Sequence, residues 1–250
     1  MLSVVLLAAG WAAGYEKYEA TFDQSYELAS GGEISLDNVN GDVTIEVWSG
    51  SEVRVQAVKT ASSPELLDEL KIIVDADSSA VRIETRYPSS RRSDDHDQPQ
   101  ERRHMKVEYT LTVPQFAVID SVDLVNGNLL IDGVEGGVEA ETVNGNIVVR
   151  NGAGDFALST VNGGIELYAG HTGSVGDVEM ESVNGSLDLY LASSGGAEIR
   201  AESVNGRIDN DFGLEVKKGK YVGSSLHGTV GGGGSSVDLE TVNGRISVHN

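Results

Sequence analysis

Hydrophobic and polar residues alternate along much of this chain, most regularly after residue 120. Apolar residues stand at every second position, as at Val138 and Ala140 or at Ile147 and Val149. Such alternation indicates half-buried strands, because successive side chains of a strand point to opposite faces of a sheet. Each alternating stretch runs into the tripeptide V-N-G, continues as a second strand and ends in a Gly-rich return. The pattern therefore predicts repeated strand–corner–strand units.

The V-N-G tripeptide occurs seven times, with Asn at positions 40, 126, 144, 162, 184, 205 and 243. From position 126 onward the steps are 18, 18, 22, 21 and 38 residues. Leu226-His227-Gly228 lies within the last step and is interpreted as a degenerate copy of the tripeptide. A repeat close to 20 residues is typical of a solenoid.

Two geometries fit an Asn-Gly pair between strands. A two-residue hairpin would repeat into an antiparallel meander or barrel. A parallel β-solenoid, a single-stranded β-helix with rungs of about 20 residues, would instead turn the Val of each tripeptide into the core, where each contributes ~1.5 kcal/mol or more. Because the hairpin leaves these Val residues on the wet face, we expect the solenoid and an inward orientation of Val39, Val125, Val143, Val161, Val183, Val204 and Val242.

Stacking of the corners has two consequences for the side chains near them. The corner Asn is expected in an αL-like conformation, with the following Gly allowing the bend. Corners ~4.8 Å apart would let one side-chain amide bond to the next. This predicts a structural ladder of Asn40, Asn126, Asn144, Asn162, Asn184, Asn205, His227 and Asn243.

Acidic residues stand three positions before most of these Asn residues, and stacking would align them in a column. Unit charges ~4.8 Å apart repel by a little under ~1 kcal/mol in water, which an exposed column tolerates. The column is interpreted as a solvated face, or alternatively as a track for calcium or for a basic partner. Its predicted members are Asp37, Asp123, Glu141, Glu181, Glu202 and Glu240.

The first half of the chain is less regular but keeps the strand pattern. We expect one β-solenoid domain over residues 15–250, with irregular rungs at 15–120 and regular V-N-G repeats at 121–250. A helix at 63–71, started by Ser63 and Pro64, would cap the stack. The charged segment 87–104 reads as a mobile loop. Its acidic run Asp94–Asp97 could bind a divalent cation, but lacks a Gly-shaped binding loop.

Residues 1–14 resemble a truncated signal segment, apolar and followed by small residues but without a basic start. The chain has 39 acidic residues against 18 Lys and Arg, a net charge of −21, and no Cys. Proteins bind nucleic acids and anionic lipids through clusters of Lys and Arg. Because this chain is strongly acidic, we expect neither as a partner. No transmembrane span is expected in the mature chain, which is predicted to be periplasmic or extracellular, at the cell surface.

The repeated step [ST]-V-N-G-x-[IL], in a Gly-rich chain without Cys, resembles the bacterial DUF4097 family, whose members are often labelled adhesins. It is similar also to the related head-domain family of autotransporter adhesins. The resemblance covers about residues 30–250 and implies a parallel β-solenoid in a cell-envelope protein. It implies no catalytic residues.

The expected function is that of a non-catalytic, exported, adhesin-like binding or scaffolding protein of the cell envelope. No cofactor is expected, with calcium as the one alternative, and an envelope protein or a glycan is the expected partner. A polysaccharide-active lyase or hydrolase on a β-helix is the first alternative, which would need acids beside Arg or His in a groove. An envelope-stress sensor module is the second.

Overall fold

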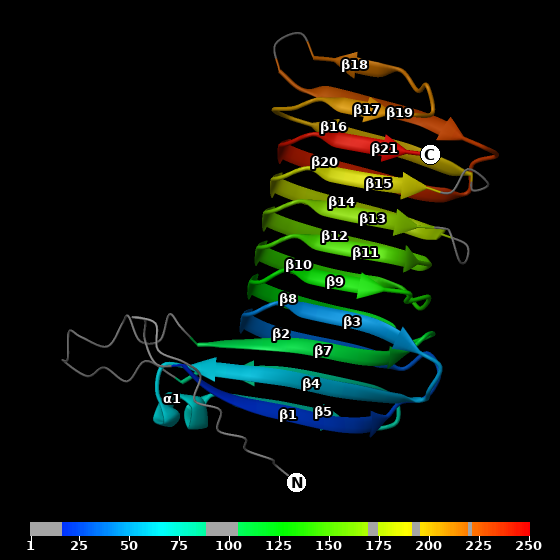
Figure 1. Ribbon diagram of the computed structural model, residues 1–250. Coiled ribbons are helices and arrows are strands. Elements are labelled where there is room, and N and C mark those ends of the chain that lie inside the picture. The colour runs from blue at the N-terminus through cyan, green and yellow to red at the C-terminus, as the bar shows by residue number, and fades with distance from the viewer. Residues whose placement is uncertain (1–16, 89–104, 170–174, 192–195, 220–221) are drawn as a thin grey trace, which may run out of the picture.

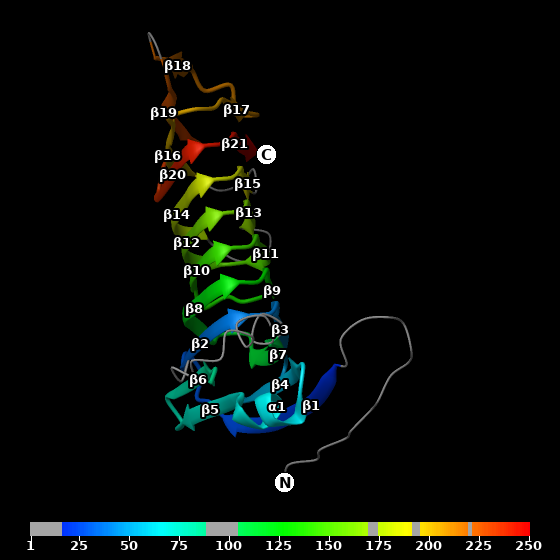
Figure 2. The ribbon, with the colours of Figure 1, turned by 90° about the vertical axis from the view of Figure 1, so that its left-hand side faces the viewer.

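The computed structural model describes residues 17–88, 105–169, 175–191, 196–219 and 222–250. The predicted signal segment 1–14 and the acidic run at 94–97 lie outside these residues. The described chain is all-β apart from one short helix, and its strands form two large mixed sheets that face each other along an elongated stack (Figures 1 and 2). The expectation of an all-β fold is confirmed.

The two sheets have ten and eleven strands. In spatial order, the ten-stranded sheet contains β1 (Tyr18–Glu27), β4 (Glu52–Ala61), β7 (Lys106–Pro114), β3 (Val43–Trp48), β9 (Leu129–Asp132), β11 (Ile147–Gly152), β13 (Ile165–Ala169), β15 (Leu187–Leu191), β21 (Ile246–His249) and β17 (Ile208–Asn210). In the same sense, the eleven-stranded sheet contains β18 (Val216–Lys218), β19 (Ser224–Val230), β16 (Ala197–Ser203), β20 (Ser235–Asn243), β14 (Val175–Asn184), β12 (Gly154–Asn162), β10 (Val138–Asn144), β8 (Val118–Asn126), β2 (Glu33–Asn40), β6 (Ala80–Arg86) and β5 (Lys71–Ala76).

The V-N-G tripeptide carries the chain from one sheet to the other. Strand β10 ends at Asn144 in the eleven-stranded sheet, and β11 begins at Ile147 in the ten-stranded sheet. Equivalent strands of neighbouring repeats pair in parallel, with Asn144 opposite Asn162 and Ile147 opposite Ile165. The alternative of Asn-Gly hairpins in a meander or barrel is therefore wrong, because the two strands beside each tripeptide do not pair with each other.

Antiparallel pairing occurs at the two ends of the stack. At the N-terminal end β1 pairs with β4, β4 with β7, and β5 with β6. The helix expected at 63–71 is α1 (Pro64–Glu69), whose first turn is capped by Ser63 Oγ, which accepts the Leu66 N–H at 3.3 Å. Helix α1 packs against β1 and β4 at this end (Figure 1). It is too short to cross a membrane, and it is the only helix among the described residues.

The last repeat is inserted into the stack. Strand β20 pairs in parallel with β14 on one side and with β16 on the other, although β16 precedes it in the chain. Strand β21 lies likewise between β15 and β17. The repeats after β15 therefore do not stack in chain order.

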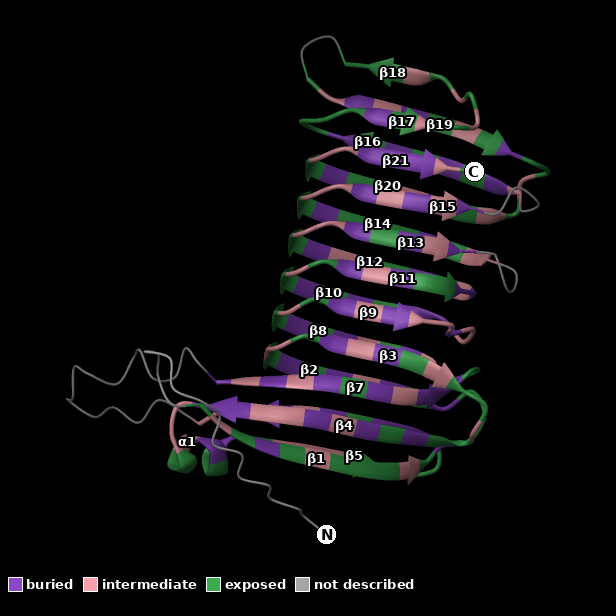
Figure 3. Ribbon diagram, in the orientation of Figure 1, coloured by how far each residue is buried: buried purple, intermediate pink, exposed green. Residues whose placement is uncertain are grey.

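Burial alternates along the strands, so that one face of each sheet meets the core (Figure 3). The corner Val residues do not belong to that core. Thr142 is buried, so that Val143, the next residue, faces outward and is 41% exposed. The seven corner Val residues are 39–50% exposed, and the predicted inward orientation is wrong.

The backbone at the corners also differs from the expectation. Among the described non-Gly residues only Asn151 has a positive φ, so the ladder Asn residues are not αL. The following Gly is required for a different reason. A Cβ on Gly163 would lie 1.9 Å from the carbonyl oxygen of Gly145, in the rung below. Close stacking of backbones, rather than a special bend, excludes a side chain there.

Candidate binding face on the eleven-stranded sheet

The corner Asn side chains form a continuous ladder of hydrogen bonds. In each step the Nδ2 of one Asn donates to the Oδ1 of its neighbour at 2.9–3.0 Å. Each internal amide thus uses one donor and one acceptor within the ladder, which lies along one border of the sheet. In spatial order the ladder consists of Asn40, Asn126, Asn144, Asn162, Asn184, Asn243 and Asn205.

His227 does not belong to this ladder, contrary to the expectation. Strand β19 runs antiparallel to β16 and places His227 opposite Arg200. The His227 ring lies 3.7 Å from the carboxylate of Glu198 instead. The Leu-His-Gly tripeptide is therefore the middle of a strand near the sheet edge rather than a corner, because its hairpin reverses the chain direction.

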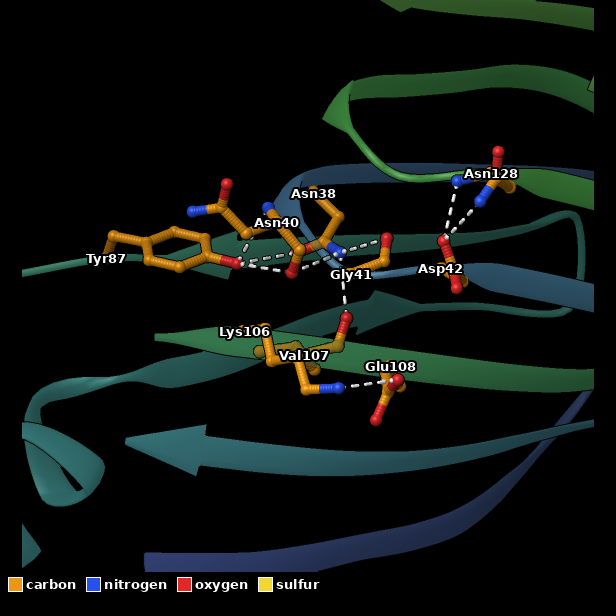
Figure 4. Close-up of polar contacts among 9 residues, drawn as sticks. All are labelled: Asn38, Asn40, Gly41, Asp42, Tyr87, Lys106, Val107, Glu108 and Asn128. Atoms are coloured by element: carbon orange, nitrogen blue, oxygen red, sulfur yellow. Dashed lines mark hydrogen bonds and ion pairs between the residues drawn. The ribbon is translucent and has the colours of Figure 1, made fainter. Parts of the chain in front are cut away.

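The ladder is anchored at its N-terminal end by a buried amide (Figure 4). Asn38 Nδ2 donates to the Val107 carbonyl at 2.9 Å, and Asn38 Oδ1 lies 3.0 Å from the hydroxyl of Tyr87. That hydroxyl also accepts the N–H of Asn40 at 3.0 Å. Burial raises the pKa of Tyr87 to about 12, so the phenol stays neutral and fixes the first rung of the ladder.

A second, shorter ladder follows the tripeptide on the ten-stranded side. Asp42 Oδ1 accepts the backbone N–H of Asn128 at 2.7 Å (Figure 4), and Asn128 Oδ1 accepts that of Asn146 at 3.0 Å. Asn146 Oδ1 in turn accepts the N–H of Gly164 at 2.8 Å. The side chains two positions after Asn40, Asn126 and Asn144 thus bond the backbone of the next rung.

Buried hydroxyls support the corners from inside, and the sequence pattern alone did not predict them. Thr160 Oγ1 donates to the Gly145 carbonyl at 3.1 Å, and Ser182 Oγ donates to the Gly163 carbonyl at 3.1 Å. Thr142, Thr241 and Ser203 make the equivalent bond. Each of these hydroxyls thus donates a hydrogen bond to a corner Gly carbonyl from the inner side of the sheet. The signal was present as the Ser or Thr before the Val of most corners.

The predicted acidic residues share one column on the outer face of the eleven-stranded sheet. Strand pairing places Asp37 beside Asp123, and it aligns all six in the order Asp37, Asp123, Glu141, Glu181, Glu240 and Glu202, with Ser159 between Glu141 and Glu181. Partial burial, together with the neighbouring Asp123, raises the pKa of Asp37. Partial burial, together with Glu179 and Glu240, raises the pKa of Glu181.

More carboxylates lie on the same outer face, nearer the starts of the strands. A hollow of about 560 Å³ crosses β8, β10, β12, β14 and β20 around Ala157. Asp155 Oδ1 accepts the N–H of Asp177 at 2.9 Å, and Asp177 Oδ1 accepts that of Ser236 at 2.9 Å. The carboxylates that line the hollow are Asp120, Glu139, Asp155, Asp177, Glu179 and Asp238.

The outer face of the ten-stranded sheet carries a different group near the C-terminus. The rings of Tyr168, Tyr190 and His249 are stacked, with centroids 4.2 and 4.4 Å apart. His249 lies 3.7 Å from a carboxylate oxygen of Asp188, which also accepts from Arg245 at 3.1 Å. Unlike the columns, this group does not repeat.

Within residues 17–88, 105–169, 175–191, 196–219 and 222–250, no group of three or more His, Asp or Glu side chains is positioned to hold a metal ion. Calcium coordination requires several oxygen ligands around one point. The acidic column instead places its carboxylates one per strand along the sheet.

Comparisons with known proteins report fold similarity. No protein-family model matches the chain, and no curated protein does. A crystal structure described as a "putative cell adhesion protein" from Clostridium sporogenes shares 16% of its residues, with a TM-score of 0.50 over 92% of this chain and 99% of that one. A "putative adhesin" from Bacteroides fragilis shares 12%, with a TM-score of 0.44 over 91% and 96%. A "putative lipid binding protein" from Parabacteroides distasonis shares 10%, with a TM-score of 0.30 over 92% and 97%. At these identities the first shows a common fold alone.

Proposed function

We propose that this protein is a parallel β-solenoid that serves as a non-catalytic, adhesin-like binding module, exported to the cell envelope or cell surface. The observation that carries the proposal is the outer face of the eleven-stranded sheet. Seven neighbouring strands there present the same three kinds of side chain in register: a carboxylate or Ser, an exposed Val and a ladder Asn. A flat, repeating surface suits binding of an extended partner better than chemistry at one point.

Two further observations support this proposal. The fold is shared with a protein from Clostridium sporogenes whose name refers to cell adhesion. The V-N-G repeat resembles the DUF4097 family, in which envelope proteins labelled adhesins are common. Membership of that family, export and the envelope location are parts of the proposal.

One observation favours a second candidate, a polysaccharide-active enzyme. Asp188, His249 and Arg245 form a non-repeating group, and Asp211 lies 3.4 Å from the other His249 nitrogen. Acids beside His and Arg are the kind of group that glycoside cleavage requires. However, His249 stacks on Tyr190 and joins neighbouring rungs, which accounts for the group as a structural contact.

A combined binding and turnover experiment tests the two candidates. Purified protein is immobilised and exposed to bacterial envelope fractions and to a glycan array, and the supernatant is assayed for released sugars. The proposal predicts retained material, unchanged by a chelator, and no released sugar. Sugar release that Asp188→Asn abolishes would establish the enzyme instead, and binding lost on chelation would point to calcium.

A further inference from the structure

The corner Val residues form an apolar column on the outside of the stack. Their exposed fractions are 39% for Val39, 41% for Val143 and 42% for Val183, and the remaining members lie between 40% and 50%. The column follows the strand order, so successive Val residues lie about 4.8 Å apart. A contiguous exposed apolar stripe bordered by polar residues typically marks an interaction surface, whereas single exposed Val residues need no explanation.

The acidic column runs beside this apolar column on the same face. Glu141 stands two residues before Val143 in β10, so the two side chains point the same way, about 6–7 Å apart. Asp37 and Val39 in β2 and Glu240 and Val242 in β20 have the same relation, and Ser159 takes the place of the carboxylate beside Val161. Burial and repulsion between neighbours raise the pKa of Asp37 and of Glu181, so bound cations would relieve an existing repulsion.

The surface between the two columns is hollowed at the N-terminal half. A depression of about 450 Å³ spans β2, β6, β8, β10 and β12. Its lining includes the corner residues Val39, Val125, Val143 and Val161 and the carboxylates of Asp37, Glu84, Asp123 and Glu141. A partner seated here would meet apolar and acidic groups at once.

Charge decides between the possible occupants. The chain carries a net charge of −21, so a second copy would bring like charges against the acidic column. An anionic lipid surface is disfavoured for the same reason. The surface complements a partner that presents apolar side chains beside Lys or Arg.

We infer that the Val column and its flanking carboxylates form the docking surface for a basic amphipathic helix that lies along the stack axis. The inference rests on the proposed function, because it names the partner class of that same face. A helix repeats every 5.4 Å, close to the strand spacing of about 4.8 Å, whereas one face of an extended strand repeats only every ~6.8 Å. Seven Val residues span about 29 Å, which corresponds to about 19 helical residues.

Synthetic peptides test the inference on the unmodified protein. The probes are a 19-residue Leu/Lys peptide with helical amphipathic order, a scrambled peptide of the same composition, and oligolysine of the same length. Fluorescence anisotropy is expected to show at least about tenfold tighter binding of the amphipathic peptide than of either control. Equal binding of the scrambled peptide or oligolysine would reduce the effect to generic attraction and overturn the inference, as would no binding.

Variants of the protein locate the site. Val143→Thr, Val161→Thr and Val183→Thr together keep β-branched shapes and are expected to weaken the amphipathic peptide about tenfold. Glu141→Gln, Glu181→Gln and Glu240→Gln together should weaken it similarly and flatten its salt dependence. The control removes three carboxylates from the other sheet by Glu46→Gln, Asp132→Asn and Glu166→Gln, and is expected to change affinity less than about twofold.

Two further outcomes separate this inference from the proposed function. Envelope fractions that bind the triple Val variant as well as the unmodified protein leave the binding module standing and overturn the docking surface. Phosphatidylcholine vesicles that bind the protein through the same Val residues would mean that the column faces lipid, which also overturns it. Failure of all envelope binding, with the peptide still bound, would instead refute the envelope function.

Discussion

The side-chain amide of Asn243 donates a 2.9 Å hydrogen bond to Oδ1 of Asn184, which lies 59 positions earlier in the sequence. This contact joins the last rung to the middle of the stack. On its other side, Asn243 Oδ1 accepts from Asn205 at 2.9 Å. The C-terminal segment is thus held by neighbours on both sides, whereas the chain before it forms the end of the stack.

The inserted rung predicts an unusual pattern of amide exchange. Chain termini normally fray, so the last strand of a repeat protein is expected to exchange quickly. In this protein β20 should exchange as slowly as β14, while the three-residue edge strand β18 exchanges fastest. Native-state hydrogen exchange read by mass spectrometry measures this order. Fast exchange over Ser235–Asn243 would contradict the insertion.

The Asn ladder predicts a difference between two neighbouring Asn-to-Asp changes. Asn144→Asp removes the donor to Asn126 Oδ1 and places a carboxylate against it. Asn146→Asp loses only the long 3.4 Å bond from Nδ2 to Asn128 Oδ1. It keeps the Oδ1 that accepts the Gly164 N–H, and Asp42 already occupies the equivalent position. We expect Asn144→Asp to lower the free energy of unfolding by about 1–3 kcal/mol, and Asn146→Asp by clearly less. Urea unfolding at neutral pH compares them, and equal losses would count against the ladder.

The corner Gly residues predict a steric effect. Gly163→Ala would place Cβ 1.9 Å from the Gly145 carbonyl oxygen, so the rungs must separate. A loss of about 3 kcal/mol or more in the free energy of unfolding is expected. Gly232→Ala is the matched control, because no atom beyond the adjacent residues of the chain lies within 4 Å of its new Cβ. Similar midpoints for the two variants in urea would refute the close stacking.

The acidic column predicts a pH effect of stated sign. The pKa of Glu181 is raised in the folded protein, so folding becomes less favourable as pH rises from 4.5 through the folded-state value. Glu181→Gln should therefore be more stable than the unmodified protein at pH 7, and this gain should disappear below pH 4.5. The gain is expected below about 1 kcal/mol, because the carboxylate is exposed and screened.

Thermal unfolding at several pH values measures this difference. Glu46→Gln, on the outer face of the other sheet, removes the same charge and serves as the control for the net charge of the chain. A loss of stability in Glu181→Gln at pH 7 would show that the column is not held against repulsion.

The strand pattern and the repeat could be predicted from the sequence, whereas the direction of the corner Val side chains could not be predicted from burial energies. The free energy gained by burying seven Val side chains favours an inward orientation. That reasoning leaves out the hydrogen bonds that the corner Gly carbonyls accept. Thr160 and Ser182 supply them from the inward position, and the period of two then turns Val161 and Val183 outward.

The order of the rungs was also beyond sequence reasoning. The segments that lead into Asn205 and Asn243 have nearly the same pattern of apolar residues, so the sequence does not say which of them pairs with β14. Ile199 and Val178 both pair with Val237 in register. What separates them is the hairpin of β18 and β19, which reverses the chain and covers the outer edge of β16. This hairpin could not be predicted from the sequence, because Leu226-His227-Gly228 resembles a V-N-G corner.

Thiol protection tests whether the protein binds its partners through the outer face of the eleven-stranded sheet. The chain has no Cys, so single substitutions Val161→Cys and Glu166→Cys each introduce one reactive thiol, on the eleven-stranded and the ten-stranded face respectively. Labelling by a soluble maleimide is timed with and without envelope fraction. We expect envelope material to slow labelling at position 161 and to leave the rate at position 166 unchanged. Unchanged labelling at 161, or protection only at 166, would contradict it.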